Sequence, residues 1–372
     1  MITDYVNNDG WFDDIADGPI RATLTLTNGE RVEVEGAWFL SAPPAYAPEI
    51  INLVTLYDTL LDVFVRELGY RPEVYDEQLW NADHRPDYDT EIRPLLERGA
   101  AHAWVVAIPP HPHELQLDRL GDSDPALDGL RTYYLDHLRS PDQANELLSS
   151  TGVPMMPYQA GDNSEEPGGL VSNYLTLTRT QHFMLRQWAA GKFIGAGQGS
   201  GPSERGGAAI DRGVLENCVG GAFGPGIEMS WISREPRIYA APFRIKARPV
   251  DPERGLSLGL DLALGLEPGD LTRYMAQPWH ADFNECSSQP IGDRMLWWWP
   301  AQRPLHVRNA ERPNVLVGWV GTIENQNADD YLMYADDLEM VEQWSKLGFV
   351  VNVGTDAEPR FVQVEKLGTG EG

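Results

Sequence analysis

The 372-residue chain has few cysteines, few basic side chains and no long apolar run. Without about 18 consecutive apolar residues, nothing in the sequence predicts a transmembrane helix. Two cysteines are too few for a disulfide framework. The 29 Lys and Arg face 56 Asp and Glu, for a formal charge of −27. This balance argues against nucleic-acid binding, because phosphate contacts need clustered basic side chains.

The start of the chain also lacks a targeting pattern. Residues 1–14, MITDYVNNDGWFDD, are acidic and contain no basic segment followed by an apolar one, so no signal peptide is predicted. We therefore expect a cytoplasmic protein without membrane contact, with unconventional export left open. The excess of acidic residues is interpreted as a solvated surface.

What the chain does contain is typical of a globular protein. Hydrophobic residues make up 42% and aromatic residues 10%, with 12 tryptophans, which suffices for a large core. Neither an internal repeat nor a domain boundary stands out. We expect one domain over residues 1–372.

Local patterns predict both helices and short strands. Residues 21–36 alternate on either side of Asn28-Gly29, which predicts a hairpin with a type I′ turn. Residues 37–44 read as a buried strand that continues from it. Further strands are predicted at 102–110, 315–322 and 349–354.

Three segments have helical spacing of apolar residues. Residues 54–68 place Tyr57, Leu60, Leu61, Phe64, Val65 and Leu68 on one face, followed by Gly69 as the cap. Residues 177–193 form a helix capped by Thr176 or Thr178. Residues 336–347 form a last helix that points Trp344 inward. The expected fold class is α+β: mixed and loop-rich, with mainly antiparallel sheets and several packed helices.

Two patterns resemble binding sites but have an ordinary interpretation. His111 and His113 flank a proline, and no cysteine or carboxylate cluster accompanies them at a metal-ligand spacing, so a surface loop is favoured. The glycine-rich residues 195–207 follow a helix instead of joining a strand to a helix. This context favours a mobile linker over a dinucleotide site.

The segment Gln277–Pro304 concentrates the reactive residue types. It holds Cys286, Asp282 four positions before it, His280 and a quarter or more of the tryptophans. If residues 281–286 are helical, Asp282 and Cys286 lie one turn apart on one face. A carboxyl group there, among aromatic side chains, is a candidate base with a raised pKa.

From these residues alone, three interpretations of Cys286 stay open. It can be an inert buried cysteine. It can join His280 and Asp282 in a metal site, although a fourth ligand is not evident. It can be a nucleophile, which requires a histidine nearby.

Several longer segments resemble the family of L-lysine ε-oxidase and glycine oxidase, whose cofactor is cysteine tryptophylquinone. The resemblance spans most of the chain in the family's order. The matching segments are NNDGWFDDIADGP, AWFLSAPPAYAPEI, VTLYDTL, YLTLTRTQHFMLRQWAAGKF, DRGVLENCVGGAFGPGIEMSW, PWHADFNEC, WWPAQRP and WSKLGFVV.

The resemblance implies a role for five residues. The family joins the cysteine of ADFN-x-C to the tryptophan of W-x-x-LGF, which here are Cys286 and Trp344. Asp282 would take part in making the quinone and in moving protons during turnover. Cys218 would lie near the substrate, and His182 matches a histidine that glycine oxidase-like members use.

The resemblance also implies an activity and partners. The expected enzyme oxidatively deaminates a primary amine or amino acid, free or peptide-borne, with O2, and releases a carbonyl product, ammonia and hydrogen peroxide. A quinone suits this reaction because no ordinary side chain accepts two electrons. We expect a flavoprotein that installs the quinone, a homo-oligomer and no metal.

One departure keeps an alternative open. Family members are longer, with a segment ahead of the NNDGW motif that contributes pocket residues, whereas this sequence begins a few residues before that motif. The alternative is a non-catalytic relative that acts as a scaffold or binding subunit without the crosslink. In that case Trp344 is a core anchor and Cys218 a plain buried cysteine. A Cys218–Cys286 disulfide would also exclude the cofactor.

Overall fold

A computed structural model describes most of the first 279 residues and short pieces beyond them. The described residues are 8, 15–43, 51–102, 115–142, 147–148, 152–156, 174–201, 204–221, 229, 231–249, 261–273, 275, 278–279, 289–291, 294–296, 306–308, 316–318, 338, 342, 349–355, 358 and 361–364.

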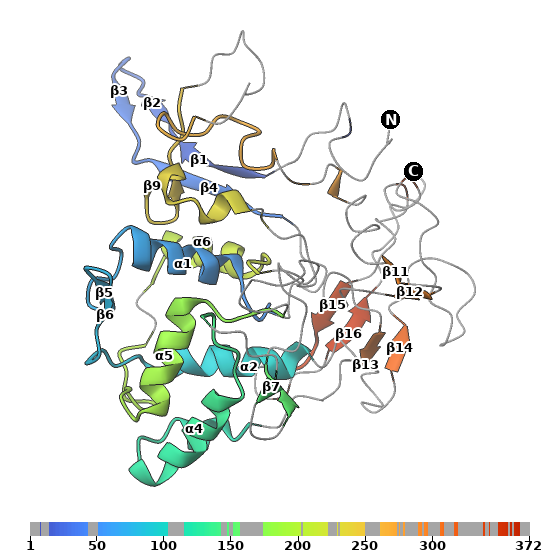
Figure 1. Ribbon diagram of the computed structural model, residues 1–372. Helices are drawn as coiled ribbons and strands as arrows, with labels where there is room; N and C mark the ends of the chain where they lie inside the picture. The colour runs from blue at the N-terminus through green and yellow to red at the C-terminus, as the bar shows by residue number, and fades with distance from the viewer. Residues whose placement is uncertain are drawn as a thin grey trace.

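The helices pack together on one side of the molecule (Figure 1). They are α1 (Leu56–Glu67), the π-helical turn η1 (Tyr88–Ile92), α2 (Arg93–His102), α3 (Leu117–Leu120), η2 (Pro125–Leu127), α4 (Asp128–Asp136), α5 (Arg179–Ala189), α6 (Gly207–Glu216), η3 (Trp231–Arg234) and η4 (Pro236–Ile238).

All strand pairs among the described residues are antiparallel and two-stranded. The pairs are β1 (Ala16–Ile20) with β4 (Ala37–Ser41), β2 (Thr23–Thr25) with β3 (Arg31–Glu33), β5 (Tyr75–Asp76) with β6 (Leu79–Trp80), β7 (Leu147–Leu148) with β8 (Val153–Pro154), β9 (Tyr239–Ala241) with β10 (Arg244–Ile245), β11 (Gln289–Ile291) with β12 (Arg294–Leu296), β13 (His306–Arg308) with β14 (Leu316–Gly318), and β15 (Phe349–Asn352) with β16 (Phe361–Val364). The predicted α+β class is confirmed.

Helix α1 forms where the apolar spacing predicts it. Thr55 caps the helix in a capping box with Asp58, which satisfies amide groups that have no partner within the helix. Gly69 ends the helix with φ of +63°, a conformation that glycine adopts without strain. Leu68 was expected on the buried face but is 41% exposed, because the helix ends one residue before it.

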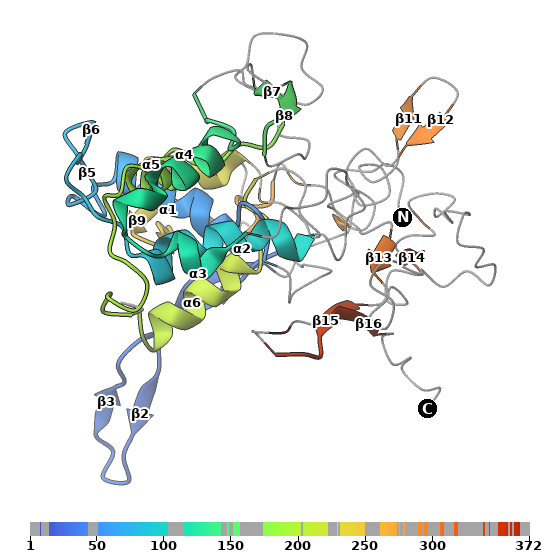
Figure 2. The same ribbon diagram turned by 90° about the horizontal axis from the view of Figure 1, so that it is seen from below.

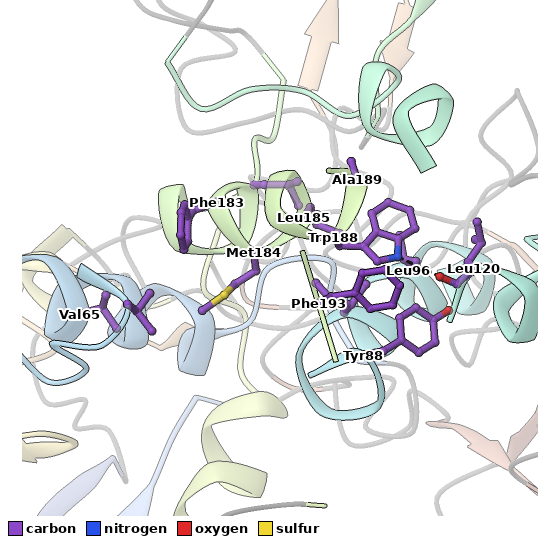
Figure 3. Close-up of a cluster of buried hydrophobic side chains, with 13 residues drawn as sticks. Val65, Tyr88, Leu96, Leu120, Phe183, Met184, Leu185, Trp188, Ala189 and Phe193 are labelled. Carbon is purple, nitrogen blue, oxygen red and sulfur yellow. Dashed lines mark hydrogen bonds between the residues drawn. The ribbon is translucent and has the colours of Figure 1, made fainter. Parts of the chain in front are cut away.

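Helix α5 carries the centre of the largest core cluster among the described residues. Thr178 caps it, as one of the two predicted candidates. The indole of Trp188 is fully buried and donates to the carbonyl of Leu120 over 3.1 Å. The rings of Tyr88 and Phe193 gather beside it (Figure 3). At the other end, the backbone N–H of Thr180 donates to Asp62 of α1 over 2.8 Å, which fixes the two helices to each other.

The predicted hairpin forms, and β2 and β3 project from the body (Figure 2). Its turn differs from the type I′ prediction. Only Gly29 has a positive φ, and its N–H donates to the carbonyl of Leu26. The turn therefore takes three residues, with glycine in the left-handed position. The following strand, β4, was expected to be buried, but Phe39 on it is 52% exposed.

The first part of the glycine-rich segment is tied into the fold instead of forming a mobile linker. Ile194 pairs with Asp87, and the N–H of Ala196 donates to the carbonyl of Gly121 over 2.9 Å. The N–H of Gly197 donates to Asp89 over 2.7 Å. A Cβ on Gly199 would lie 1.5 Å from the carboxylate of Asp87. Position 199 is occupied by glycine because the Asp87 carboxylate lies too close to leave room for a side chain.

The prediction for the strand at 102–110 is wrong at its first residue, because His102 ends helix α2. The remainder of that segment lies outside the described residues. Strands β14 and β15 confirm the predictions at 316–318 and 349–352. Most of the predicted helix at 336–347, including Trp344, lies outside the described residues.

Asp17 on β1 is a titrating group inside the fold. Burial raises its pKa from 3.8 to about 6, although the Trp38 indole N–H that it accepts and the charge of Arg244 act in the opposite direction. The nearby charge of Asp211 raises the pKa further. Ionising this carboxyl group therefore destabilises the folded state.

The raised pKa of Asp17 predicts a loss of stability as the pH rises from about 4 to about 6. In that window the folded chain binds more protons than the unfolded chain, so the free energy of unfolding falls with pH, by at most about 3 kcal/mol and less because the carboxyl group is partly solvated. Urea unfolding of wild type and Asp17→Asn at several pH values measures the difference. Asp118→Asn, at a solvated aspartate, is the control and should retain the slope. Parallel curves for wild type and Asp17→Asn would contradict the prediction.

Candidate functional site

The structure describes two of the five site residues that the resemblance implies. Cys218 follows helix α6, and His182 lies on α5. Cys286, Trp344 and Asp282 lie outside the described residues, so their proximity stays a prediction. The same holds for a Cys218–Cys286 disulfide and for a metal site with His280.

Cys218 is packed into the core beneath α1. It is 1% exposed and belongs to a cluster with Leu56, Tyr57 and Leu215. Its carbonyl accepts the N–H of Leu56 over 2.9 Å. Burial among apolar groups suits a neutral thiol better than a thiolate.

Residues 219–221 cross the N-terminus of α1 at close range. Val219 pairs with Thr55, and the carbonyl of Gly220 accepts the hydroxyl of Thr59 over 2.7 Å. A Cβ on Gly220 would lie 1.9 Å from the carbonyl oxygen of Thr55. Only glycine fits at 220, and this crossing fixes the backbone next to Cys218.

His182 lies in a different environment. Burial and the charge of Arg186 lower its pKa, while Asp142 acts in the opposite direction. None of the contacts described for His182 involves the cluster around Cys218. The structure therefore places both residues in the helical body without bringing them together.

An ion pair is buried next to the crossing. Arg98 of α2 contacts Asp58 of α1 at 2.5 Å, and the two side chains are 6% and 7% exposed. Asp58 also accepts the N–H and the hydroxyl of Thr55, at 2.8 Å each. One carboxylate thus joins α2 to the N-terminus of α1.

A cavity of about 530 Å³ opens beside this ion pair. Its walls come from helices α1, α2, α5 and α6, the segments 70–73, 87–91 and 194–201, and Glu204. The residues that line it are Tyr57, Asp58, Leu61, Tyr70, Arg71, Glu73, Asp87, Thr90, Glu91, Pro94, Leu95, Arg98, Thr178, Thr180, Gln181, Met184, Ile194, Ser200, Gly201, Glu204 and Arg212. We refer to it as the helical cavity.

One wall of the helical cavity is a charged aromatic unit. The hydroxyl of Tyr57 donates to Glu204 over 2.9 Å, and Arg212 pairs with Glu204 at 3.3 Å. The guanidinium of Arg212 lies over the Tyr57 ring, 4.6 Å from its centre, and Phe243 stacks on Tyr57 at 5.1 Å. No local sequence pattern points to this unit, because its members are widely separated along the chain and carry no motif.

Trp279 has a buried indole N–H. It is 8% exposed, and its indole N–H has no hydrogen-bond partner among the described residues. A buried donor normally has a partner. Trp279 lies three positions before Asp282, so an acceptor is expected from the neighbouring part of the chain or from a bound group.

The described ranges contain neither a metal-binding cluster nor a membrane-spanning helix. No three His, Cys, Asp or Glu side chains converge there as a metal-binding group. His111 and His113 lie outside those ranges. No described helix is both long enough and apolar enough to cross a bilayer.

Comparison with known families identifies the class of protein. The L-lysine epsilon oxidase C-terminal domain matches residues 157–302, and the L-lysine epsilon oxidase N-terminal domain matches residues 1–41. Together the two matches take in half of the chain. The chain therefore belongs to the L-lysine epsilon-oxidase family.

Individual relatives agree with this assignment. The chain is 28% identical over 457 residues to L-lysine 6-oxidase of Marinomonas mediterranea, covering 98% of this chain and 61% of the relative. A solved structure of L-Lys epsilon-oxidase from the same organism, a Schiff base intermediate with L-Lys, aligns with a TM-score of 0.73 and 26% identity. That alignment covers 96% of this chain and 64% of the solved one. Another structure of that oxidase gives the same TM-score. The chain thus spans less than two thirds of the length of these relatives.

Proposed function

We propose that the chain is a cysteine tryptophylquinone-dependent oxidase of a primary amine or amino acid, free or peptide-borne. The observation that carries the proposal is the 28% identity to L-lysine 6-oxidase over 98% of the chain. Asp282 and Cys286 fall inside the matched range 157–302. Trp344 lies beyond that range, and its role depends on the W-x-x-LGF motif.

The residues of the chain have distinct parts in this proposal. The quinone made from Trp344 would supply an electrophilic carbonyl group and accept two electrons from the amine. Cys286 would hold the ring in place through its thioether. Asp282 would remove the α-proton of the substrate, and a raised pKa would suit it to that task near neutral pH.

The surroundings of Trp279 support a polar group in this region. Its buried indole N–H lacks an acceptor among the described residues. Quinone oxygens are acceptors, and a carboxylate is another. Asp282 and the thioether residue Cys286 lie within seven positions of Trp279 in the sequence, so in this proposal either the carboxylate or the quinone would remove the cost of an unpaired buried donor.

The stoichiometry of the reaction tests the proposal. One amine, one O2 and one water should give one carbonyl product, one ammonia and one hydrogen peroxide. The chain is produced together with the flavoprotein from its own source and supplied with L-lysine, glycine and lysine-containing peptides. Peroxide and ammonia are measured together. Mature, crosslinked protein that releases neither product from any of these amines would contradict an oxidase and favour the non-catalytic relative.

A further inference from the structure

We propose that the helical cavity binds a short peptide with free ends, about two to four residues long. Its volume of about 530 Å³ lies within the range of roughly 300–1,000 Å³ that small-molecule sites occupy. A single small amino acid would leave much of that space to water. The inference concerns binding at this cavity and stands whether or not the quinone forms.

The lining has both charge signs and an apolar floor. Leu61, Leu95 and Met184 form the apolar part. Five carboxylates face three guanidiniums around the cavity, a net charge of −2. A polyanion such as a nucleotide is therefore disfavoured, whereas a ligand with one positive and one negative end matches both signs. The charged lining residues are Asp58, Glu73, Asp87, Glu91, Glu204, Arg71, Arg98 and Arg212.

Glu204 is the carboxylate that faces the ammonium group in this proposal. The side chain of Glu204 is 20% exposed, whereas that of Asp58 is paired with Arg98 and only 7% exposed. The ring of Tyr70 lines the cavity with it, and aromatic faces attract cations. The charge of Glu204 also raises the pKa of Tyr70, second to burial, so the two groups lie near each other.

Arg71 is the matching group for a carboxylate. Its side chain is 26% exposed, and it pairs with Glu73 at 2.9 Å and with Glu91 at 2.6 Å. Those contacts use Nε and Nη1, which leaves the second terminal nitrogen of the fork for a ligand.

Hydroxyl groups supply the remaining requirement of a peptide, which is hydrogen bonding along its main chain. Tyr70, Thr90 and Ser200 line the cavity. A hydroxyl group both donates and accepts. Thr90 already donates to Asp87 over 3.1 Å and offers its oxygen as an acceptor, so together these side chains suit the alternating carbonyl and N–H groups of a peptide.

Titration calorimetry with trialanine and its two capped forms tests the proposal. We expect trialanine to bind with a Kd of roughly 0.3 mM, from the usual affinity per atom of small ligands. N-acetyl-trialanine lacks the ammonium group and trialanine amide lacks the carboxylate. Each should bind at least about tenfold more weakly, because each loses charge-assisted hydrogen bonds. The titrations use wild type without O2 and are repeated with Trp344→Phe, so that turnover does not contribute.

Two variants assign the ends of the peptide. Glu204→Gln should weaken the binding of trialanine about tenfold and leave the binding of N-acetyl-trialanine unchanged. Arg71→Gln should likewise weaken the binding of trialanine about tenfold and leave the binding of trialanine amide unchanged. Glu235→Gln and Arg237→Gln, which remove charges of an ion pair outside the cavity, should change neither. Equal binding of the free and capped peptides to wild type would overturn the proposal, as would no binding at tenfold above the expected Kd. The oxidase proposal would be untouched, since it is tested by products.

Discussion

Replacing Cys286 by Ser, or Trp344 by Phe, is expected to reduce amine oxidation to the rate without protein. Either change removes the thioether, and the second also removes the indole from which the quinone is made. The remaining side chains cannot accept two electrons. Peroxide release from protein produced with the modifying flavoprotein is the measurement, with loss of the visible quinone absorbance as a second readout.

Asp282→Asn should give a graded result instead of a complete loss, with rates compared per molecule of crosslinked protein because Asp282 also takes part in making the quinone in this proposal. An amide cannot remove the α-proton, and loss of a general base costs about 10²–10⁴ in rate. Trp231→Phe changes a largely exposed tryptophan and is the matched control, with activity retained. Wild-type rates in Cys286→Ser or Trp344→Phe would eliminate the crosslinked cofactor from the account.

Arg98→Met is expected to lower the free energy of unfolding by about 3–5 kcal/mol. Arg98 and Asp58 are almost fully buried in contact at 2.5 Å. Removing one partner leaves a buried carboxylate without its counter-charge. Asp58 also caps α1 through Thr55, so the loss should spread to the helix end beside residues 219–221. Urea unfolding followed by far-UV circular dichroism measures the change.

A matched variant lies on the same helix. Arg93 pairs with two exposed carboxylates, Glu97 and Asp118, so Arg93→Met should cost no more than about 1 kcal/mol. Adding Asp58→Asn to Arg98→Met should recover part of the loss, because the uncompensated charge is then gone. Equal effects of Arg93→Met and Arg98→Met would argue against a special role of the buried pair.

The elements that the sequence predicts well are those with strong local patterns. The hairpin at 21–36 follows from alternation around a glycine turn, and α1 follows from one apolar face between Thr55 and Gly69. Even in the hairpin, the alternation of residues does not determine the length of the turn. The turn takes three residues, because only Gly29 adopts a positive φ.

Burial was less predictable than secondary structure. Phe39 sits in an alternating strand next to a hairpin, yet it is 52% exposed, because β4 pairs only with β1 among the described strands. The glycines at 195–199 suggested a mobile linker, whereas contacts with Asp87 and Asp89 tie them to the fold. Such contacts join residues more than 100 positions apart, and no local pattern encodes them.

The candidate sites divide in the same way. Asp282 and Cys286 are close in sequence and were recognised through a short motif. The unit of Tyr57, Glu204 and Arg212 joins residues 147 positions apart and has no motif. Glu204 is one of the excess acidic residues that composition alone assigns to a solvated surface. Long-range pairing of charges, and not composition, places that carboxylate in a cavity.

Intact mass spectrometry tests the central claim most directly. The chain is produced beside its natural modifying flavoprotein and compared with Cys286→Ser made in the same way. A mature cofactor adds two oxygen atoms to the wild-type chain and removes four hydrogen atoms, and a peptide digest should contain Cys286 and Trp344 in one crosslinked fragment. A wild-type mass equal to that of the unmodified sequence would contradict the oxidase account.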